Sequence, residues 1–345
     1  MRRPTPRGPL SEALLAALIQ DPGPVPEVAQ QAAQAVARTE DVLADDDVQL
    51  ALTVLYELHY RGVDGVDERW EWQPDLLAVR ATLEEEFEAA LRALVPVPDV
   101  AARTAPEVAQ ALFDLTAADD GPSVSGYVAK RATDDQVHEF VALRSIYQLK
   151  EADPHSWALP RLSGRPKSAL IEIQTDEYGG GRPGHIHSEL FAGMMRALDL
   201  DDAYGAYLDH VPASTLASVN AMSLFGLHRR LRGAITGHLA AYEMTSSIPC
   251  RKYGNGFRRL GYGPEATAYW DEHVEADAVH EQIAGRDLAG ALAELEPQVR
   301  DDVLWGAAAY LAVDGVAGVE MLAAWERGES ALRRPLVRSS AVTVS

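Results

Sequence analysis

The chain has 345 residues, of which 47% are hydrophobic, enough for one large domain or two small ones with a sizeable core. Its 52 acidic residues outnumber 31 basic ones, and the net charge of −21 repels phosphate backbones and anionic lipids, so we expect neither nucleic-acid nor membrane partners. The single cysteine, Cys250, excludes a disulfide framework, a cysteine-based zinc site and an iron–sulfur cluster within one chain. The N-terminus does not resemble a signal peptide, and no uninterrupted apolar run approaches about 18 residues, so we expect a soluble cytoplasmic protein.

The first part of the chain predicts helices separated by short breaks. Residues 1–10, which contain three arginines and three prolines, are expected to form a flexible leader. Helices are predicted over residues 11–19, 25–43, 46–60 and 74–94, the last three from apolar residues at three- and four-residue spacing. Alternating strand patterns are nearly absent from the whole sequence, which therefore predicts an all-α protein.

The next helix is predicted from about residue 133 to 152, because Thr133, Asp134 or Asp135 can cap its start and Pro154 stops it. Its inward stripe passes through Phe140 and reaches Glu151, which lies about 20° away in projection. Taken alone, a glutamate in a last turn is better explained by a side chain that reaches solvent. His155 is a rival ligand, although Pro154 is expected to place it off the helix.

A glycine-rich turn follows, with Glu177 before it and His185 and His187 after it. Three glycines suggest a phosphate loop, but the P-loop lysine and hydroxyl residue are missing. A better interpretation is a helix that ends near Glu177, a turn, and a new helix that begins near His185. The turn would bring Glu177 back toward one of the two histidines, and periodicity does not choose between them.

A long helix is predicted from about residue 214 to 247, with a bend at one of its glycines and Pro249 as its end. One mainly apolar stripe contains Phe225 and, five helical turns later, Glu243. Arg229 and Arg232 project near the same stripe. They could pair with a ligand carboxylate or an acidic substrate, but we favour an ion pair between helices, or a bend that turns them outward.

The most informative segment is a helix predicted to begin at Pro264 and end at Gly285. His273, Asp277 and His280 lie at about 0°, 40° and −20° around its axis, on its buried face. Burial of two imidazoles and a carboxylate is costly without a partner, and a bound cation is the simplest compensation. The alternative is a polar core network, in which the histidines cap carbonyls or pair with the aspartate.

Together, four helical segments each place carboxylates or imidazoles on a plausible inward face. The candidate metal ligands are Glu151, Glu177, His187, Glu243, His273, Asp277 and His280. Such a set is typical of a di-iron or di-manganese site inside a helical bundle. Two divalent ions would neutralise four carboxylates, whereas a single zinc would leave an excess of buried negative charge.

These motifs resemble those of the haem-oxygenase-like di-iron oxidases, also described as iron-containing redox enzymes. The resemblance rests on residues 147–155, residues 176–181 with His187 ten residues after Glu177, then Glu243, and the His273-x3-Asp277-x2-His280 helix. It covers roughly residues 130–330 and implies that all seven candidates are ligands, with His187 favoured over His185. It also implies a haem-oxygenase-like helical bundle over residues 131–330, a helical N-terminal extension over 1–130 and a flexible tail over 331–345.

The resemblance implies two ferrous ions, dioxygen as co-substrate and an external reductant. It suggests oxygenation or a related oxidation of a small amine or amino-acid-like metabolite. Alternatives are an oxidative decarboxylase or C–C lyase of an amino or fatty acid, and a non-catalytic metal-binding helical protein. The expected partner is a small-molecule substrate, and a homodimer remains open.

Overall fold

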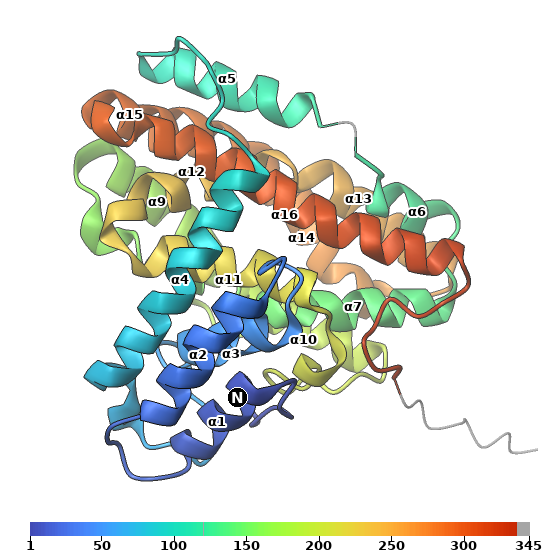
Figure 1. Ribbon diagram of the computed structural model, residues 1–345. Coiled ribbons are helices and arrows are strands. Elements are labelled where there is room, and N and C mark those ends of the chain that lie inside the picture. Colours follow the sequence, from blue (N-terminus) through green and yellow to red (C-terminus); the bar gives the residue numbers. More distant parts are fainter. Residues whose placement is uncertain (120, 337–345) are drawn as a thin grey trace, which may run out of the picture.

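The computed structural model describes residues 1–119 and 121–336, with the backbone alone for 275–278. Helices follow one another throughout this part of the chain, and it contains no β-strand (Figure 1). The predicted all-α class is therefore confirmed.

The first six helices begin at the signals that the sequence carries. Proline occupies the first turn of four of them, and Asp45 caps α3 by accepting hydrogen bonds from two backbone N–H groups. These helices are α1 (Pro9–Leu18), α2 (Pro26–Arg38), α3 (Asp46–Glu57), α4 (Pro74–Leu94), α5 (Ala105–Ala117) and α6 (Val124–Lys130).

The remaining helices form the bundle that carries the candidate ligands. They are α7 (Asp134–Gln148), α8 (Asp153–Ser156), α9 (Gly164–Glu177), α10 (His187–Ala197), α11 (Ala213–Leu227), α12 (Arg232–Met244), α13 (Ser247–Arg259), α14 (Pro264–Gln282), the π-helical segment η6 (Ile283–Gly290), α15 (Ala291–Leu295) and α16 (Arg300–Glu326). In Figure 1, α16 crosses the molecule in front of the bundle, while α1 to α3 lie together below it.

The predicted flexible leader is wrong for most of its length. The Met1 ammonium donates to the carbonyl of Gly62, and Arg7 donates to the carbonyls of Leu208 and Val211. The Arg7 side chain also pairs with Asp46 at 2.8 Å and is 1% exposed. These long-range contacts hold residues 1–8 against the body of the protein.

The single long helix predicted over residues 214–247 is also wrong, because the chain forms α11, a short turn and α12 instead. Pro249 does not end a helix; it lies in the first turn of α13, where a missing N–H is tolerated. The expected ion pair between elements is present: Arg232 is 9% exposed and pairs with Glu296, whereas Arg229 is exposed.

Gly285 does not end the helix that begins at Pro264. The helix continues through η6 into α15. Gly285 instead permits close packing, since an added Cβ would lie 2.4 Å from the Cε of Met244 at the end of α12. Single π turns inside helices are frequent at functional sites, and here the π segment directly follows the candidate ligand helix.

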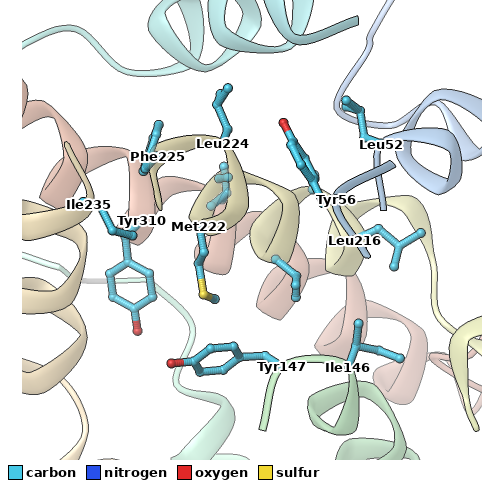
Figure 2. Packing of buried hydrophobic residues seen from close by; sticks show 14 of the residues in the cluster. Leu52, Tyr56, Ile146, Tyr147, Leu216, Met222, Leu224, Phe225, Ile235 and Tyr310 are labelled. Atoms are coloured by element: carbon cyan, nitrogen blue, oxygen red, sulfur yellow. The ribbon is translucent and has the colours of Figure 1, made fainter. Parts of the chain in front are cut away.

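The core centres on α12 and α16, which approach closely because glycines face the other helix. A Cβ at Gly237 would lie 1.8 Å from the carbonyl oxygen of Val303, and one at Gly306 would lie 2.1 Å from that of Ala234. Within the described residues, Pro297–Glu326 is the one helix that has the length and composition to cross a membrane. Buried core helices share those properties, and Figure 2 shows its Tyr310 packed among side chains of other helices.

Residues 331–336, the described part of the predicted tail, lie against the body of the protein. Arg333 pairs with Asp46 at 2.8 Å, and its backbone N–H donates to the carbonyl of His210. The boundary predicted near residue 130 stays a prediction.

Candidate metal centre

Glu151 reaches the core from a turn and not from the end of a helix. The helix predicted to run to residue 152 stops at Gln148, and Ala152 adopts a left-handed conformation with φ of 72°. The Nε2 group of Gln174 donates to the Ala152 carbonyl at 2.9 Å and supports this strained backbone. As a result the Glu151 side chain is only 3% exposed.

The glycine turn works as predicted and selects His187. Gly179 has a φ of +65°, and a Cβ there would lie 2.5 Å from the carbonyl carbon of His185, so only glycine fits. The turn places Nδ1 of His187 3.0 Å from Oε2 of Glu177, and both side chains are buried. His185 is exposed.

Glu243 and His280 meet across α12 and α14. Nδ1 of His280 lies 3.5 Å from Oε2 of Glu243, and both side chains are at most 4% exposed. On the other side of the ring, Nε2 of His280 donates to Oδ2 of Asp176 at 3.0 Å. This bond fixes the orientation of the ring, with Nε2 toward Asp176 and Nδ1 toward Glu243.

A hydrogen bond on one ring nitrogen also orients His273. Its Nδ1 donates to the carbonyl of Tyr269 at 2.8 Å, and its Nε2 lies 3.5 Å from Oε1 of Glu151. The hydroxyl of Tyr269 donates to both carboxylate oxygens of Glu151, at 2.8 and 2.9 Å. One tyrosine therefore orients two of the candidate ligands, through its backbone and its side chain.

The structure brings six of the seven candidate ligands into two adjoining groups. In each group the ligand atoms all lie within 4.8 Å of one another. One group contains Glu151, Glu177, His187 and His273, and the other contains Glu177, Glu243 and His280. Glu177 belongs to both groups. The seventh candidate, Asp277, has a side chain outside the described residues.

The electrostatics of the two groups show strong pairing between carboxylates and imidazoles. Burial alone would raise the pKa of Glu177, but the neighbouring imidazoles, His187 foremost, lower it to about 2. Burial dominates at Glu243 and raises its pKa. Burial opposes the charge of His280, yet hydrogen bonds and charges from Glu243 and Asp176 raise its pKa to about 9. Burial also opposes the charge of His187, but the charge of Glu177 raises its pKa, so His187 and His280 both favour the charged form beside the carboxylates.

The donor set fits iron. Imidazole nitrogens and carboxylate oxygens are the ligands of non-haem iron centres in helical bundles, and hydrogen bonds on one ring nitrogen orient His273 and His280. The seven sequence-predicted residues are those that would hold iron, and the side chains of six of them are described.

Two supporting residues were not identified from the sequence. Asp176 directly precedes Glu177, and Tyr269 lies four residues before His273 on the same helix face. Tyr269 could have been found from the sequence, because residues at i and i+4 share a helix face. Asp176 could not, since an aspartate beside a buried glutamate is normally solvated.

His155, the rival ligand, is buried in α8 but belongs to neither group among the described side chains. Its Nε2 lies 3.1 Å from Nδ1 of His238 on α12. Burial lowers the pKa of both imidazoles, that of His155 to about 4, so both favour the neutral form. Both rings pack against Tyr242.

Comparison with known proteins agrees with this geometry. A search of curated proteins gives no match. A family model described as iron-containing redox enzyme matches residues 138–315, about half of the chain, and this span includes all seven candidate ligands. With an all-α fold and a buried cluster of histidines and glutamates inside the matched region, the chain belongs to the iron-containing redox enzyme family.

Proposed function

We propose that the protein is a di-iron enzyme that activates dioxygen and oxidises a small amine or amino-acid-like metabolite. The observation that supports this proposal best is the sharing of Glu177 by two adjoining ligand groups. A single ion needs only one such group. Two ferrous ions, with a charge of +4, would be balanced by the four carboxylates of the candidate set, Asp277 included.

The chain's own residues prepare the site for such ions. Tyr269 and Asp176 hold ligand side chains in place before any metal arrives, which reduces the reorganisation on binding. The surrounding rings of Tyr147, Tyr242 and Phe191 are largely buried and limit access of water to the ligands. Bound irons would supply the two electrons that start dioxygen reduction, and an external reductant would return them so that one oxygen atom enters the substrate and the other leaves as water.

Consumption of dioxygen tests the proposal. The metal-free protein is loaded with ferrous iron without air and then mixed with oxygenated buffer and a chemical reductant. We expect consumption beyond the amount of iron added. Glu177→Gln, which alters the residue common to both groups, should remove it, whereas Glu281→Gln, on a half-exposed face of α14, should not.

Two results would contradict the proposal. Iron uptake followed by a single stoichiometric oxidation would indicate a storage protein, and undiminished consumption by Glu177→Gln would place the chemistry elsewhere. Mass spectrometry of a metabolite mixture after turnover separates oxygen insertion, with a gain of one oxygen atom, from decarboxylation or C–C cleavage.

A further inference from the structure

A cavity of about 330 Å³ lies beside the candidate metal centre and reaches Tyr269 and His273. A smaller pocket of about 60 Å³ adjoins it and is lined by Tyr147, Met222 and Tyr310, which converge from three helices in Figure 2. The two spaces share several lining residues, so they form one region along the inner side of α7. A small molecule placed there would lie next to two of the groups that would hold or orient metal.

An arginine and an aspartate face each other in this region. Nη1 of Arg144, on α7, lies 3.4 Å from Oδ1 of Asp314, on α16, and both residues line both spaces. Their side chains are 26% and 33% exposed, so each remains accessible from the cavity. A guanidinium presents several N–H donors in a planar fork that matches a carboxylate, and this contact with the aspartate engages only one of its nitrogens.

A third polar group completes the arrangement. Gln148, one helical turn after Arg144 on the same face of α7, lines both spaces and is 3% exposed. Its Nε2 donates to the hydroxyl of Tyr242 at 3.1 Å, which fixes the orientation of the amide. Among the described residues its Oε1 has no hydrogen-bond partner. A buried amide oxygen without a donor is uncommon, and a ligand N–H would satisfy it.

We propose that this cavity binds the substrate as an amino-acid zwitterion. The fork of Arg144 receives the carboxylate, while Asp314 and Oε1 of Gln148 accept N–H groups from the ammonium. The inference deepens the proposed function and rests on it only for the identification of the bound molecule as the substrate.

Charge balance favours a zwitterion over simpler ligands. Arg144 and Asp314 are neutral as a pair, and a zwitterion can replace each partner's contact without adding net charge to the cavity. A fatty acid would bring its carboxylate beside Asp314 with no cation to offset the repulsion. An amine without a carboxylate would leave the guanidinium facing a second cation. Both mismatches penalise the wrong ligand, which is how polar sites discriminate between related molecules.

Binding is measured by isothermal titration calorimetry on the full chain, without metal and loaded with Mn²⁺, a redox-inert stand-in for ferrous iron. The twenty common L-amino acids are titrated first. The tightest binder is then compared with the amine that lacks its carboxylate and the acid that lacks its amino group. We expect the amino acid to bind at least about 10-fold more tightly than either, since each lost charged hydrogen bond weakens binding by roughly that factor or more.

Variants locate the site. Arg144→Gln and Asp314→Asn should each weaken binding of the amino acid by roughly 10- to 100-fold. Arg2→Gln is the matched control, because Arg2 pairs with Asp201 at 2.8 Å on the surface, with side chains 59% and 43% exposed. This control should bind as the wild type does. Circular dichroism establishes that each variant is folded, and Asp314→Asn keeps the test decisive should Arg144→Gln fail to fold.

The proposal is overturned if the amine or the acid binds as tightly as the amino acid, if folded Arg144→Gln or Asp314→Asn binds like the wild type, or if no amino acid binds at ~10 mM. The heat of binding is measured without iron or dioxygen, so a failure of the binding-site proposal can be told apart from a failure of the proposed oxidase function. Amino-acid binding without dioxygen consumption would refute the oxidase and leave the binding site standing.

Discussion

The buried ion pair between Glu57 and Lys150 offers a sharp test of how the N-terminal helices support the metal centre. Glu57 ends α3, and its Oε2 lies 3.5 Å from Nζ of Lys150, the residue before Glu151. The two side chains are 1% and 3% exposed. The hydroxyl of Tyr204 donates to the same carboxylate at 2.8 Å, and the ammonium lies 4.3 Å from the ring centroid of Tyr60.

Replacement of Glu57 by glutamine keeps the shape and the acceptor for Tyr204 but leaves the ammonium of Lys150 buried without its counter-charge. Removal of one member of a buried pair typically destabilises a protein by about 3–5 kcal/mol. The retained hydrogen bond from Tyr204 and the aromatic ring over the ammonium reduce this destabilisation, so we expect the free energy of unfolding to fall by about 3 kcal/mol. The double variant Glu57→Gln/Lys150→Met buries no charge and should recover most of that loss.

Urea unfolding, followed by circular dichroism and by tryptophan fluorescence, measures these free energies where the two probes coincide. Arg2→Gln, at an exposed pair, should cost less than about 1 kcal/mol. The reasoning is refuted if Glu57→Gln is as stable as that control, or if the double variant is no more stable than the single one.

Three further outcomes follow from the packing and from the site. Gly237→Ala should destabilise the chain by about 3 kcal/mol or more in the same urea assay, because its Cβ would overlap a backbone carbonyl of α16. The control Gly315→Ala has open space around its Cβ and should be neutral or stabilising by about 0.5–1 kcal/mol. His280→Ala should lower the iron content after dialysis while the fold survives, and Glu281→Ala should match the wild type; the reverse order would show that the wrong face of α14 was assigned to the metal. Tyr269→Phe removes a hydrogen bond to a ligand carboxylate, so its affinity for ferrous iron should fall by ~10–100-fold in a chelator competition, and an unchanged affinity would contradict the orienting role.

The sequence was most informative where local chemistry decides the structure. Proline in a first turn, a capping residue and apolar spacing are local signals, and α4 runs as expected from Pro74 to Leu94. The turn after Glu177 was predictable for the same reason, because few residues other than glycine adopt the positive φ values found at Gly179–Gly181.

Elsewhere distant parts of the chain decide the structure, and the sequence misled or was silent. Residues 1–8 are rich in proline and arginine, as flexible leaders are, yet Arg7 is held by carbonyls about 200 residues away. The break between α11 and α12 falls at residues 228–231, outside the glycines that were expected to bend it. Gly226 instead allows contact with the carbonyl of Pro154.

The proposed binding cavity shows the same limit. On α7, Arg144 and Gln148 look like ordinary polar positions of an amphipathic helix. They face a cavity only because α16 lies opposite, and Asp314 is 170 residues further along the chain. Spacing identified candidate ligands that share a helix face, such as His273 and His280, but gave no signal for partners that meet only through the tertiary fold.

The most direct test of the two-ion centre is the metal content of the protein. The metal-free chain is loaded with excess ferrous iron without air, freed of unbound metal on a desalting column, and analysed for iron and zinc by mass spectrometry against protein concentration. Because one carboxylate is shared by two adjoining ligand groups, we expect the iron content to approach two ions per chain. A content that stays at one ion or below, or a single tightly held zinc that ferrous iron does not replace, would contradict the di-iron assignment.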